Sequence, residues 1–458
     1  MATGRRIGRL FLTSLIRCFL ENRSSGTSAQ IRFQRSARVS RGRVRRSLDE
    51  PQAEKGECRM DNDRMAWFRE AKFGMFIHWG LYSLLKRGEW VMHSEALPAE
   101  KYRALAEEMD PGRDAVRQWI RLAARAGMKY VVLTAKHHDG FCLFNTQLTD
   151  FNSAARGAGR DYVREFVEAC RGEGLRVGLY YSLGDWSLPA YQAAAAGDSA
   201  QASALALFIR GQIRELLTNY GRIDILWYDG AWYDGKYLTP EILGMAETNA
   251  MVRELQPDII INDRSGLGGD FSTCENECRP APMGRDWEMC TCINDIWGYC
   301  EHDYNYKTFN QLVFLLVNCA TQGGNLLLNI SPRGDGSVPE EQERRLSAVG
   351  AWLETHGESI FGVERLPGAF FPAGRIARKA ETLYLHAFYW PGTVMRVPDV
   401  PKRMVNWAPG RTVLSGEILT TGMSVRCGWD GSTLVLDGLP ASPPDKADTV
   451  IRVSPAGV

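Results

Sequence analysis

Residues 223–230 of the chain read Ile223-Asp224-Ile225-Leu226-Trp227-Tyr228-Asp229-Gly230. The apolar and aromatic part of this run has the length of a buried strand, and a carboxylate and a glycine follow it. An Asp-Gly pair in that place most often starts a turn or caps the next helix. It is also the place where the catalytic groups of a parallel barrel collect. Taken alone, this run favours the turn.

Similar apolar runs recur on both sides of this one, and amphipathic segments separate them. The predicted strands are Phe73–Trp79, Lys129–Thr134, Arg176–Ser182, Ile223–Tyr228, Ile259–Asn262, Met289–Ile293 and Leu326–Ile330. The predicted helices between them are Asp161–Arg171, Leu205–Leu217, Glu241–Leu255 and Phe309–Ala320. Strands that alternate with helices are typical of a parallel sheet built from βα units.

Two folds fit this alternation: an eight-stranded barrel with one weak strand, and a doubly wound open sheet. The residues at the ends of the predicted strands distinguish between them. Polar and aromatic residues stand at or just after many of these ends: His78, His137, His138, Tyr181, Asp229, Arg264 and, nearby, Trp297. In a barrel all these ends meet at one mouth, whereas an open sheet gathers its ligand at one switch point. We therefore predict an α/β fold with a (β/α)₈, TIM-like barrel.

The pattern of residues along the chain changes after a predicted helix at Glu340–His356. Short β segments punctuated by Gly and Pro follow, at Thr382–Trp390, Arg411–Thr420, Gly422–Gly428, Thr433–Leu436 and Thr449–Val453. This pattern is typical of a small β-sandwich. The predicted organisation is a leader over residues 1–59, a catalytic barrel over 60–360 and a C-terminal β-sandwich over 361–458.

Composition and charge limit the kinds of partner that the protein can have. The 458 residues are 45% hydrophobic and 24% charged, with a formal net charge of +1, as in an ordinary soluble globular protein. A chain without a strong net field has no general attraction for nucleic acid or anionic lipid, and no apolar run is long enough for a membrane span. We expect a neutral ligand, no nucleic acid and no membrane partner. The sequence is compatible with a homo-oligomer.

The eleven cysteines are an odd number spread unevenly along the chain, so we expect most to be reduced, which favours the cytoplasm. Their densest group suggests zinc but lacks a pair of Cys-x-x-Cys knuckles, so we expect no metal. That group is Cys274, Cys278, Cys290, Cys292 and Cys300.

The leader has a different composition from the rest of the chain. Residues 1–48 are dense in Arg, contain no Lys and have Glu21 as their only acid. Such a segment has little apolar surface to bury, and we expect a disordered extension. An upstream translation start before Met60 or Met65, or an organellar transit peptide, would also account for it.

The predicted strand ends carry the chemistry that a sugar ligand needs. Lys136-His137-His138-Asp139-Gly140 follows one strand, and Gly140 marks the change from strand to loop that lets two neighbouring histidines reach one ligand. Aromatic residues stand beside polar ones at the other ends. A pyranose combines apolar C–H faces with hydroxyl groups, so it needs both kinds of side chain. The two histidines could instead bind a metal ion or stabilise the loop. Each aromatic residue, taken alone, more often belongs to the hydrophobic core.

Six segments, in this order, resemble glycoside hydrolase family 29, the α-L-fucosidases. They are Lys72–Gly80, Gly88–Trp90, Ala135–Phe141, Gly178–Ser182, Leu226–Gly230 and Asn262–Arg264, and the likeness spans roughly residues 65–360. The resemblance implies that Asp229 attacks the anomeric carbon of a terminal fucose. It also implies a sugar pocket formed by His78, Glu89, Trp90, His137, His138, Tyr181 and Arg264, with Trp297 near the fucose methyl group. It implies no metal or organic cofactor.

A retaining glycosidase needs a second, protonated carboxyl about 5 Å from the nucleophile, and here three glutamates compete. Glu275, which we place first, ends the stretch Gly269–Glu275, where many relatives have Pro in place of Cys274. We expect it on a long loop that folds over the barrel mouth. Glu288 begins an apolar run and is expected lower in the barrel, holding the sugar or an arginine. Glu277 comes third.

The sequence thus predicts hydrolysis of terminal α-L-fucose from glycans or glycoconjugates by double displacement. A catalytically silent sugar-binding protein on the same fold is the alternative, since a fold does not guarantee its chemistry. The strand-end Asp229 and the nearby acids argue against it. Nucleic-acid binding through the Arg-rich leader is a third hypothesis, which the near-neutral remainder does not support.

Overall fold

The protein is described by a computed structural model that covers residues 63–232, 235–366, 371–400 and 413–456. Residues 1–59, and with them the predicted leader, lie outside the described residues. Eight strands form the first sheet: β1 (Phe73–Ile77), β2 (Tyr130–Lys136), β3 (Arg176–Ser182), β4 (Ile225–Asp229), β5 (Ile260–Ile261), β6 (Phe271–Glu275), β7 (Asp286–Cys292) and β8 (Asn325–Ile330).

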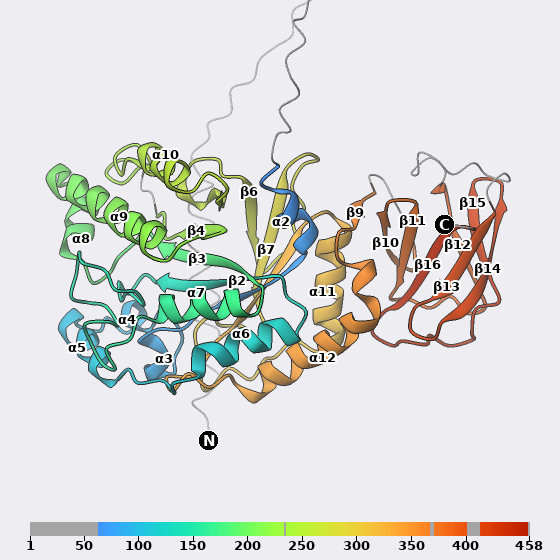
Figure 1. The fold of residues 1–458 in the computed structure, drawn as a ribbon, viewed down its shortest axis with the longest axis horizontal. Helices are drawn as coiled ribbons and strands as arrows, with labels where there is room; N and C mark the ends of the chain where they lie inside the picture. Colours follow the sequence, from blue (N-terminus) through green and yellow to red (C-terminus); the bar gives the residue numbers. More distant parts are fainter. Residues whose placement is uncertain (1–62, 233–234, 367–370, 401–412, 457–458) are drawn as a thin grey trace, which may run out of the picture. The chain divides into compact units, whose positions relative to one another are not determined.

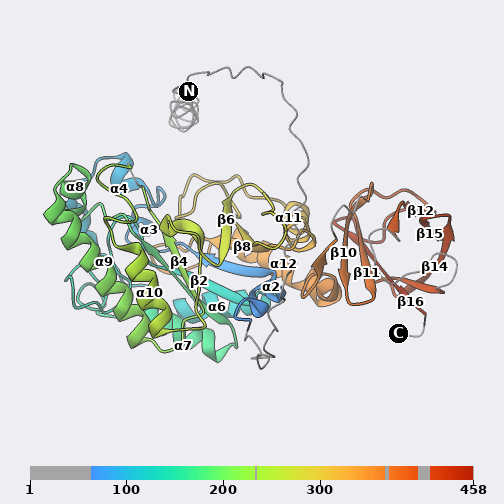
Figure 2. The same ribbon diagram turned by 90° about the horizontal axis from the view of Figure 1, so that it is seen from above.

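The first sheet is a parallel, nearly closed barrel (Figures 1 and 2). Its strand order is β5-β4-β3-β2-β1-β8-β7-β6, and each pair between neighbours is parallel. Between β5 and β6 the pairing is reduced to one parallel bridge, Asn262 to Phe271. The carboxyl ends of all eight strands therefore meet at one mouth, as the sequence predicted.

The eighth strand, β6, is the one that the sequence analysis missed. Residues Phe271–Glu275 are mostly half-buried and mostly polar or small, so they form no apolar run. Glu275, which we expected on a long loop, is instead the last residue of this strand. A strand end holds a side chain at the mouth more firmly than a loop does.

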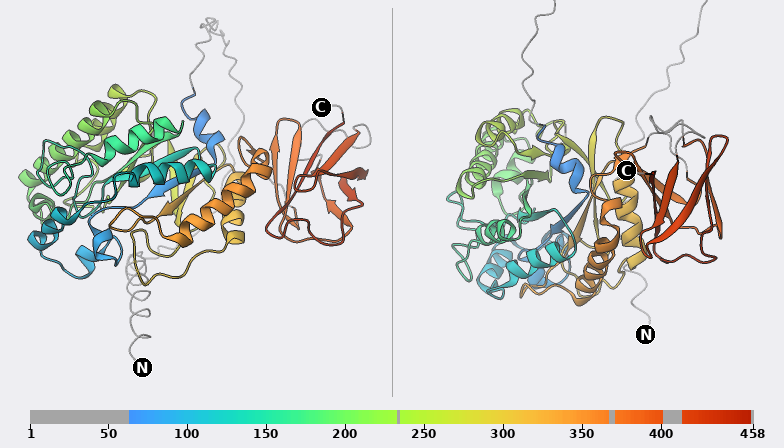
Figure 3. Two further views of the ribbon diagram at one scale, coloured as in Figure 1. Left: turned by 60° about the horizontal axis from the view of Figure 1, so that its bottom comes forward. Right: turned by 45° about the vertical axis from the view of Figure 1, so that its right-hand side comes forward.

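The helices cover the outside of the barrel (Figure 3). Around the barrel the structure has α2 (Ala66–Ala71), α3 (Tyr82–Leu85), α4 (Val91–Ser94), α5 (Ala99–Ala104), η2 (Leu105–Glu108), α6 (Ala115–Arg125), α7 (Tyr162–Gly172), α8 (Pro189–Ala195), α9 (Ser199–Asn219), α10 (Met245–Leu255), η3 (Asp263–Ser265), α11 (Phe309–Thr321), α12 (Glu340–His356) and η4 (Gly357–Ser359). Helix α9 begins six residues earlier than the apolar pattern predicted, because Asp198 caps it by accepting from the backbone N–H groups of Ala200 and Gln201.

The barrel interior has its own core, distinct from the layer between strands and helices. Phe76, Tyr130, Tyr180 and Trp227 point inward from the strands, and Phe68 of α2 packs against the same cluster. The rings of Phe68 and Phe271 lie 4.7 Å apart. The interior is thus filled by side chains, as in other small parallel barrels. A ligand must therefore bind at the mouth of the barrel.

The C-terminal part is one antiparallel sheet of eight strands. They are β9 (Glu364–Arg365), β10 (Gly374–Lys379), β11 (Thr382–Ala387), β12 (Val394–Val397), β13 (Leu414–Ile418), β14 (Met423–Asp430), β15 (Thr433–Asp437) and β16 (Thr449–Pro455), in the order β12-β15-β14-β13-β16-β11-β10-β9. Strand β14 pairs with β13 through its first half and with β15 through its second. One apolar core joins side chains from both halves of the sheet, among them Leu385 of β11 and Leu434 of β15. The predicted boundary at residues 360/361 falls between η4 and β9.

Candidate active site

A cavity of about 170 Å³ opens at the carboxyl ends of the barrel strands. It is lined by Phe76, His78, Glu89, Trp90, His137, His138, Tyr180, Trp227, Asp229, Trp232, Arg264, Glu275, Cys290 and Trp297. Its size suits one monosaccharide ring, and its lining mixes aromatic faces with hydrogen-bonding groups. A larger hollow of about 980 Å³ lies on the outer helices α6 and α7, among surface Arg, Asp and Glu residues, and contains none of the strand-end residues.

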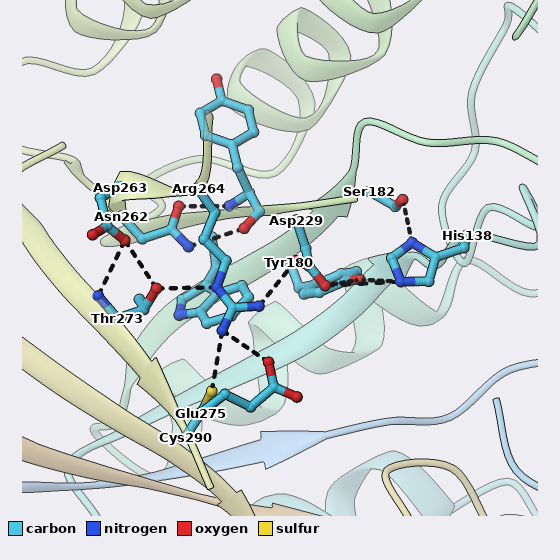
Figure 4. Close-up of polar contacts among 12 residues, drawn as sticks. His138, Tyr180, Ser182, Asp229, Asn262, Asp263, Arg264, Thr273, Glu275 and Cys290 are labelled. Atoms are coloured by element: carbon cyan, nitrogen blue, oxygen red, sulfur yellow. Dashed lines mark hydrogen bonds and ion pairs between the residues drawn. The ribbon is translucent and has the colours of Figure 1, made fainter. Parts of the chain in front are cut away.

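Asp229, the last residue of β4, is held by two donors (Figure 4). Its Oδ1 accepts from Nη1 of Arg264 at 3.0 Å, and its Oδ2 accepts from the hydroxyl of Tyr180 at 2.9 Å. The ring Nε2 of His138 is 3.8 Å from Oδ2. A carboxylate fixed through both oxygens has a defined direction toward the cavity, which is what a nucleophile needs.

Arg264 connects Asp229 with the second acid. Its Nη2 donates to Oε2 of Glu275 at 3.0 Å, and its Nε donates to the hydroxyl of Thr273 at 3.0 Å. The Glu275 Oε1 accepts from the indole N–H of Trp297 at 3.1 Å. One planar guanidinium therefore holds both carboxylates at the mouth (Figure 4).

The charge of Arg264 is secure although the side chain is largely buried. Burial alone would lower its pKa, but Cys290, Asp229 and Glu275 beside it raise the pKa above the ordinary value. The guanidinium also lies over the indole ring of Trp227, 4.7 Å from its centroid.

The three histidines of the cavity are neutral near pH 7. Burial lowers the pKa of His78 to about 4 and also lowers the pKa values of His137 and His138 well below the ordinary value. Uncharged imidazoles can donate or accept hydrogen bonds without bringing an unpaired charge into the pocket. This suits a neutral, hydroxyl-rich ligand.

Two of these rings are oriented by neighbours, and one has an unused nitrogen. His78 Nδ1 is 2.7 Å from Oδ1 of Asn329, and His138 Nδ1 is 2.6 Å from the hydroxyl of Ser182. The buried Nδ1 of His137 finds no hydrogen-bond partner within the part of the chain that the structure describes. A buried polar atom without a partner is costly, and a ligand hydroxyl would satisfy it.

Glu89 lines the pocket from a buried position. Its Oε2 accepts from the backbone N–H of Gly298 at 2.7 Å. Burial raises its pKa, although that hydrogen bond opposes the rise. Trp90, the next residue, stands at the rim and is 43% exposed.

The structure brings together most of the predicted site residues but not Tyr181. His78, Glu89, Trp90, His137, His138, Asp229, Arg264, Glu275 and Trp297 all line the cavity. The Tyr181 hydroxyl instead donates to Gln212 of α9 at 2.8 Å, in the layer between the sheet and the helices. Its neighbour Tyr180 points into the cavity. Successive side chains of a strand face opposite sides, so an error of one residue moved the prediction to the wrong face.

Glu288 is also absent from the cavity lining. It is completely buried in β7, where it accepts a hydrogen bond from Tyr130 and another from the indole N–H of Trp227 at 3.0 Å. As expected, it lies lower in the barrel, but it holds two aromatic residues rather than the sugar. Glu277 is exposed and paired with Arg279. The motif Trp227-Tyr228-Asp229-Gly230 recurs at Trp232–Gly235, and Asp234 of that second copy lies outside the described residues.

Sequence reasoning missed several lining residues: Phe76, Tyr180, Trp227, Trp232 and Cys290. The signal that could have found two of them is the period of two. In the register of the barrel, Tyr180 pairs with Trp227 and Ser182 pairs with Asp229, so Tyr180 and Trp227 share the inward face with the acid.

Comparison with known proteins decides the family. The family model described as alpha-L-fucosidase matches residues 46–358. The chain belongs to the α-L-fucosidase family. The tissue α-L-fucosidase of Mus musculus is 30% identical over 418 residues, which cover 83% of this chain and 88% of that protein. The tissue α-L-fucosidase of Rattus norvegicus is 34% identical over 324 residues, or 64% and 69% of the two chains.

Solved structures of α-L-fucosidases agree with the fold. Isoenzyme 1 from Paenibacillus thiaminolyticus is 35% identical with a TM-score of 0.78, covering 86% of this chain and 99% of that one. An α-L-fucosidase from Bacteroides thetaiotaomicron, trapped as a covalent intermediate with 2-fluoro-fucosyl fluoride, is 26% identical with a TM-score of 0.75, covering 85% and 95%. The protein is thus a retaining α-L-fucosidase that acts on fucosylated glycans, and the silent sugar-binding alternative is not favoured.

The described residues contain no metal-binding cluster and no helix that could span a membrane. No group of three or more His, Cys, Asp or Glu in them is arranged to hold a metal ion. None of their helices is long and apolar enough to cross a membrane.

Proposed function

We propose that Asp229 is the nucleophile and Glu275 the general acid–base of this α-L-fucosidase. The observation that carries the proposal is the Arg264 guanidinium, which donates to Asp229 and to Glu275, each at 3.0 Å, at the mouth of a monosaccharide-sized cavity. Retention requires two carboxyl groups close together, one to attack and one to transfer a proton.

In the first step, an oxygen of Asp229 attacks the anomeric carbon of the fucose and the bond from that carbon to the leaving oxygen breaks. Glu275 gives its proton to the leaving oxygen. In the second step, Glu275 takes a proton from water, the water oxygen attacks the same carbon, and the ester to Asp229 breaks. Two inversions give net retention.

The other lining residues bind the sugar. The neutral imidazoles of His78, His137 and His138 offer hydrogen bonds to its hydroxyl groups, while Phe76 and Trp297 offer apolar faces to its C–H groups and methyl. Tyr180 and Arg264 hold Asp229 against rotation. As the ester forms, the negative charge of Asp229 disappears, and Arg264 remains paired with Glu275, which must next act as a base.

Two variants, Asp229→Gly and Glu275→Ala, test this assignment with an aryl α-L-fucoside and sodium azide. Asp229→Gly should lose nearly all turnover, and azide should partly restore it and give the β-fucosyl azide, because the anion attacks from the vacated face. Glu275→Ala should keep substantial fucosylation by an activated aryl fucoside. It should lose roughly 10²–10⁴-fold with an unactivated disaccharide, and with azide it should give the α-fucosyl azide.

Glu277→Ala is the matched control, because Glu277 is exposed and paired with Arg279, and its kinetics should stay near those of the wild type. The assignment is overturned if Glu288→Ala gives the α-azide while Glu275→Ala only weakens binding. Wild-type protein that fails to hydrolyse the aryl fucoside would contradict the activity itself. A first-formed β-fucose, detected by proton NMR, would contradict retention.

We also propose that this enzyme works in the cytoplasm without a nucleic-acid or membrane partner. The net charge of +1 supports the second part, since it provides no general attraction for polyanions. The nine described cysteines carry free thiols, which supports a reducing compartment. Fusing residues 1–59 to a fluorescent reporter tests the location, because a transit peptide would direct the reporter to an organelle. A homo-oligomer is compatible with these features, and sedimentation equilibrium measures it.

A further inference from the structure

The cavity has room for one sugar ring, so the rest of a fucosylated glycan must lie outside it. Three of the lining residues are classed as exposed and mark the mouth: Glu275, Trp90 and Trp232. The leaving group must pass between them, since Glu275 is the residue proposed to protonate it. The surface at this mouth therefore meets the leaving-group sugar.

One side of the mouth is an aromatic shelf made of Trp90, Trp186 and Trp232. The rings of Trp186 and Trp232 are nearly parallel, 5.9 Å apart with an interplanar angle of 6°. Trp90 meets them obliquely, 5.1 Å from Trp186 and 5.6 Å from Trp232. The three residues come from three segments of the mouth: Trp90 precedes α4, Trp186 follows β3 and Trp232 follows β4.

The shelf is continuous with the fucose pocket. His138, whose ring reaches toward Asp229, lies 4.5 Å from the ring of Trp232 and 5.3 Å from that of Trp186. His93 also stacks on Trp186, with the ring centroids 5.1 Å apart. Trp90 and Trp232 keep 43% and 41% of their surface exposed.

Large aromatic faces left in water at a binding mouth are typical of surfaces that bind a ligand. We propose that Trp90, Trp186 and Trp232 form a subsite that stacks the apolar C–H face of the leaving-group sugar, a neutral hexopyranose. The proposal rests on the proposed function of the pocket and adds the class of leaving group. Aromatic faces carry no net charge, so they favour a neutral ring with a continuous C–H face.

Trp186 is the residue to change, because it belongs to the shelf but does not line the fucose pocket. Two substrates separate the two sites. α-L-Fucosyl fluoride has a one-atom leaving group and uses the pocket alone, whereas a fucosyl-hexose disaccharide also uses the shelf. In Trp186→Ala, kcat/KM for the disaccharide should fall roughly tenfold, as expected for one lost aromatic stacking contact. For the fluoride it should stay within about twofold.

Two further variants keep the test decisive if Trp186→Ala folds poorly. Trp186→Leu keeps an apolar side chain without an aromatic face and should show the same selective loss. Trp186→Phe restores an aromatic face and should recover most of the disaccharide activity. Melting temperature, measured for each variant by circular dichroism, separates misfolding from a change in selectivity.

Four results would overturn the subsite. Wild-type activity of Trp186→Leu toward both substrates would mean that the leaving sugar does not touch the shelf. An equal loss on both substrates would mean that Trp186 supports the fucose pocket instead. Wild-type protein that cleaves the fluoride but not the disaccharide would leave the pocket assignment standing and remove the hexose subsite. Wild-type protein that cleaves neither would remove both.

Discussion

The hydroxyl of Tyr180 donates a hydrogen bond to Oδ2 of Asp229, while Arg264 holds Oδ1. This single hydroxyl group therefore helps to orient the proposed nucleophile. We expect Tyr180→Phe to lower kcat by about 10- to 100-fold, because a hydrogen bond to a charged group contributes about 1.5–3 kcal/mol. Steady-state kinetics with an aryl α-L-fucoside would measure the loss.

Tyr181→Phe is the matched control for this prediction. The hydroxyl of Tyr181 donates to Gln212 behind the sheet and does not reach the cavity. Its loss should lower the melting temperature slightly and leave kcat within about twofold. If Tyr181→Phe impairs catalysis more than Tyr180→Phe, the placement of the two tyrosines on opposite faces is wrong.

Glu288 makes the stability of the folded protein depend on pH. Burial raises its pKa from the ordinary value of 4.5 to about 7, although the hydrogen bonds from Tyr130 and Trp227 and the charge of Arg264 oppose the rise. Between about pH 4.5 and 7 the folded protein thus keeps a proton that the unfolded chain releases. Glu288 therefore makes the folded state less stable as the pH rises through this window.

We expect Glu288→Gln to remove this loss, because an amide stays neutral and can still accept from Trp227. Its melting temperature relative to that of the wild type should rise between pH 4.5 and 7.5. Differential scanning calorimetry of both proteins across this range measures the difference, and the other titrating groups are common to the two. A difference that is constant with pH, or that falls, would contradict the raised pKa.

At the scale of elements, the turn after β4 depends on Gly230. Its φ is +67°, and a Cβ built on it would lie 2.6 Å from the hydroxyl of Ser182 and 3.0 Å from Nδ1 of His138. Gly230→Ala should therefore combine left-handed backbone strain of about 1–2 kcal/mol with displacement of the Ser182–His138 hydrogen bond. We expect both the melting temperature and kcat to fall.

Gly235→Ala separates the two effects. Gly235 also has a positive φ, +71°, but a Cβ there would meet nothing within 4 Å among the described residues. This variant should show the backbone strain alone and keep kcat near the wild-type value. Equal losses of kcat in both variants would mean that contact with His138 is not the cause.

The whole barrel, rather than any one segment, assembles the site. The successive strands β1 to β7, or the residues shortly after them, supply His78, His137, Tyr180, Asp229, Arg264, Glu275 and Cys290, and Asn329 of β8 orients His78. Residues more than 200 positions apart in the sequence thus touch one sugar-sized space. This convergence follows from the closed parallel topology, in which every strand ends at the same mouth.

The segment 1–59 lies outside the described residues, and its composition carries a prediction at the scale of the whole molecule. An Arg-rich stretch with little apolar surface has little to bury. Deleting residues 1–59 should leave aryl-fucoside hydrolysis and the melting temperature almost unchanged. Deleting residues 1–45 is the milder control, since the family match begins at residue 46. A fall of more than a few degrees in the 1–59 deletion alone would place a stabilising segment between residues 46 and 59.

Local patterns in the sequence were enough for the (β/α)₈ class and for part of the pocket. Apolar runs separated by amphipathic segments predicted seven strands, and the strand ends gave six residues that line the cavity: His78, His137, His138, Asp229, Arg264 and Trp297. The resemblance to family 29 added Glu89 and Trp90, and the search for a second carboxyl group added Glu275. The apolar runs and the strand ends are local signals, because a strand and the group that ends it are neighbours in the chain.

Only the tertiary structure decided which face each strand presents and which acid reaches the mouth. Tyr180 replaced Tyr181 because the register of β3 against β4 sets the inward side. Strand β6 is held by pairing with β7 rather than by its own apolar character, and that pairing brings Glu275 to Arg264 while Glu288 remains buried below. Register and pairing are contacts between distant segments, so no single stretch of sequence specifies them.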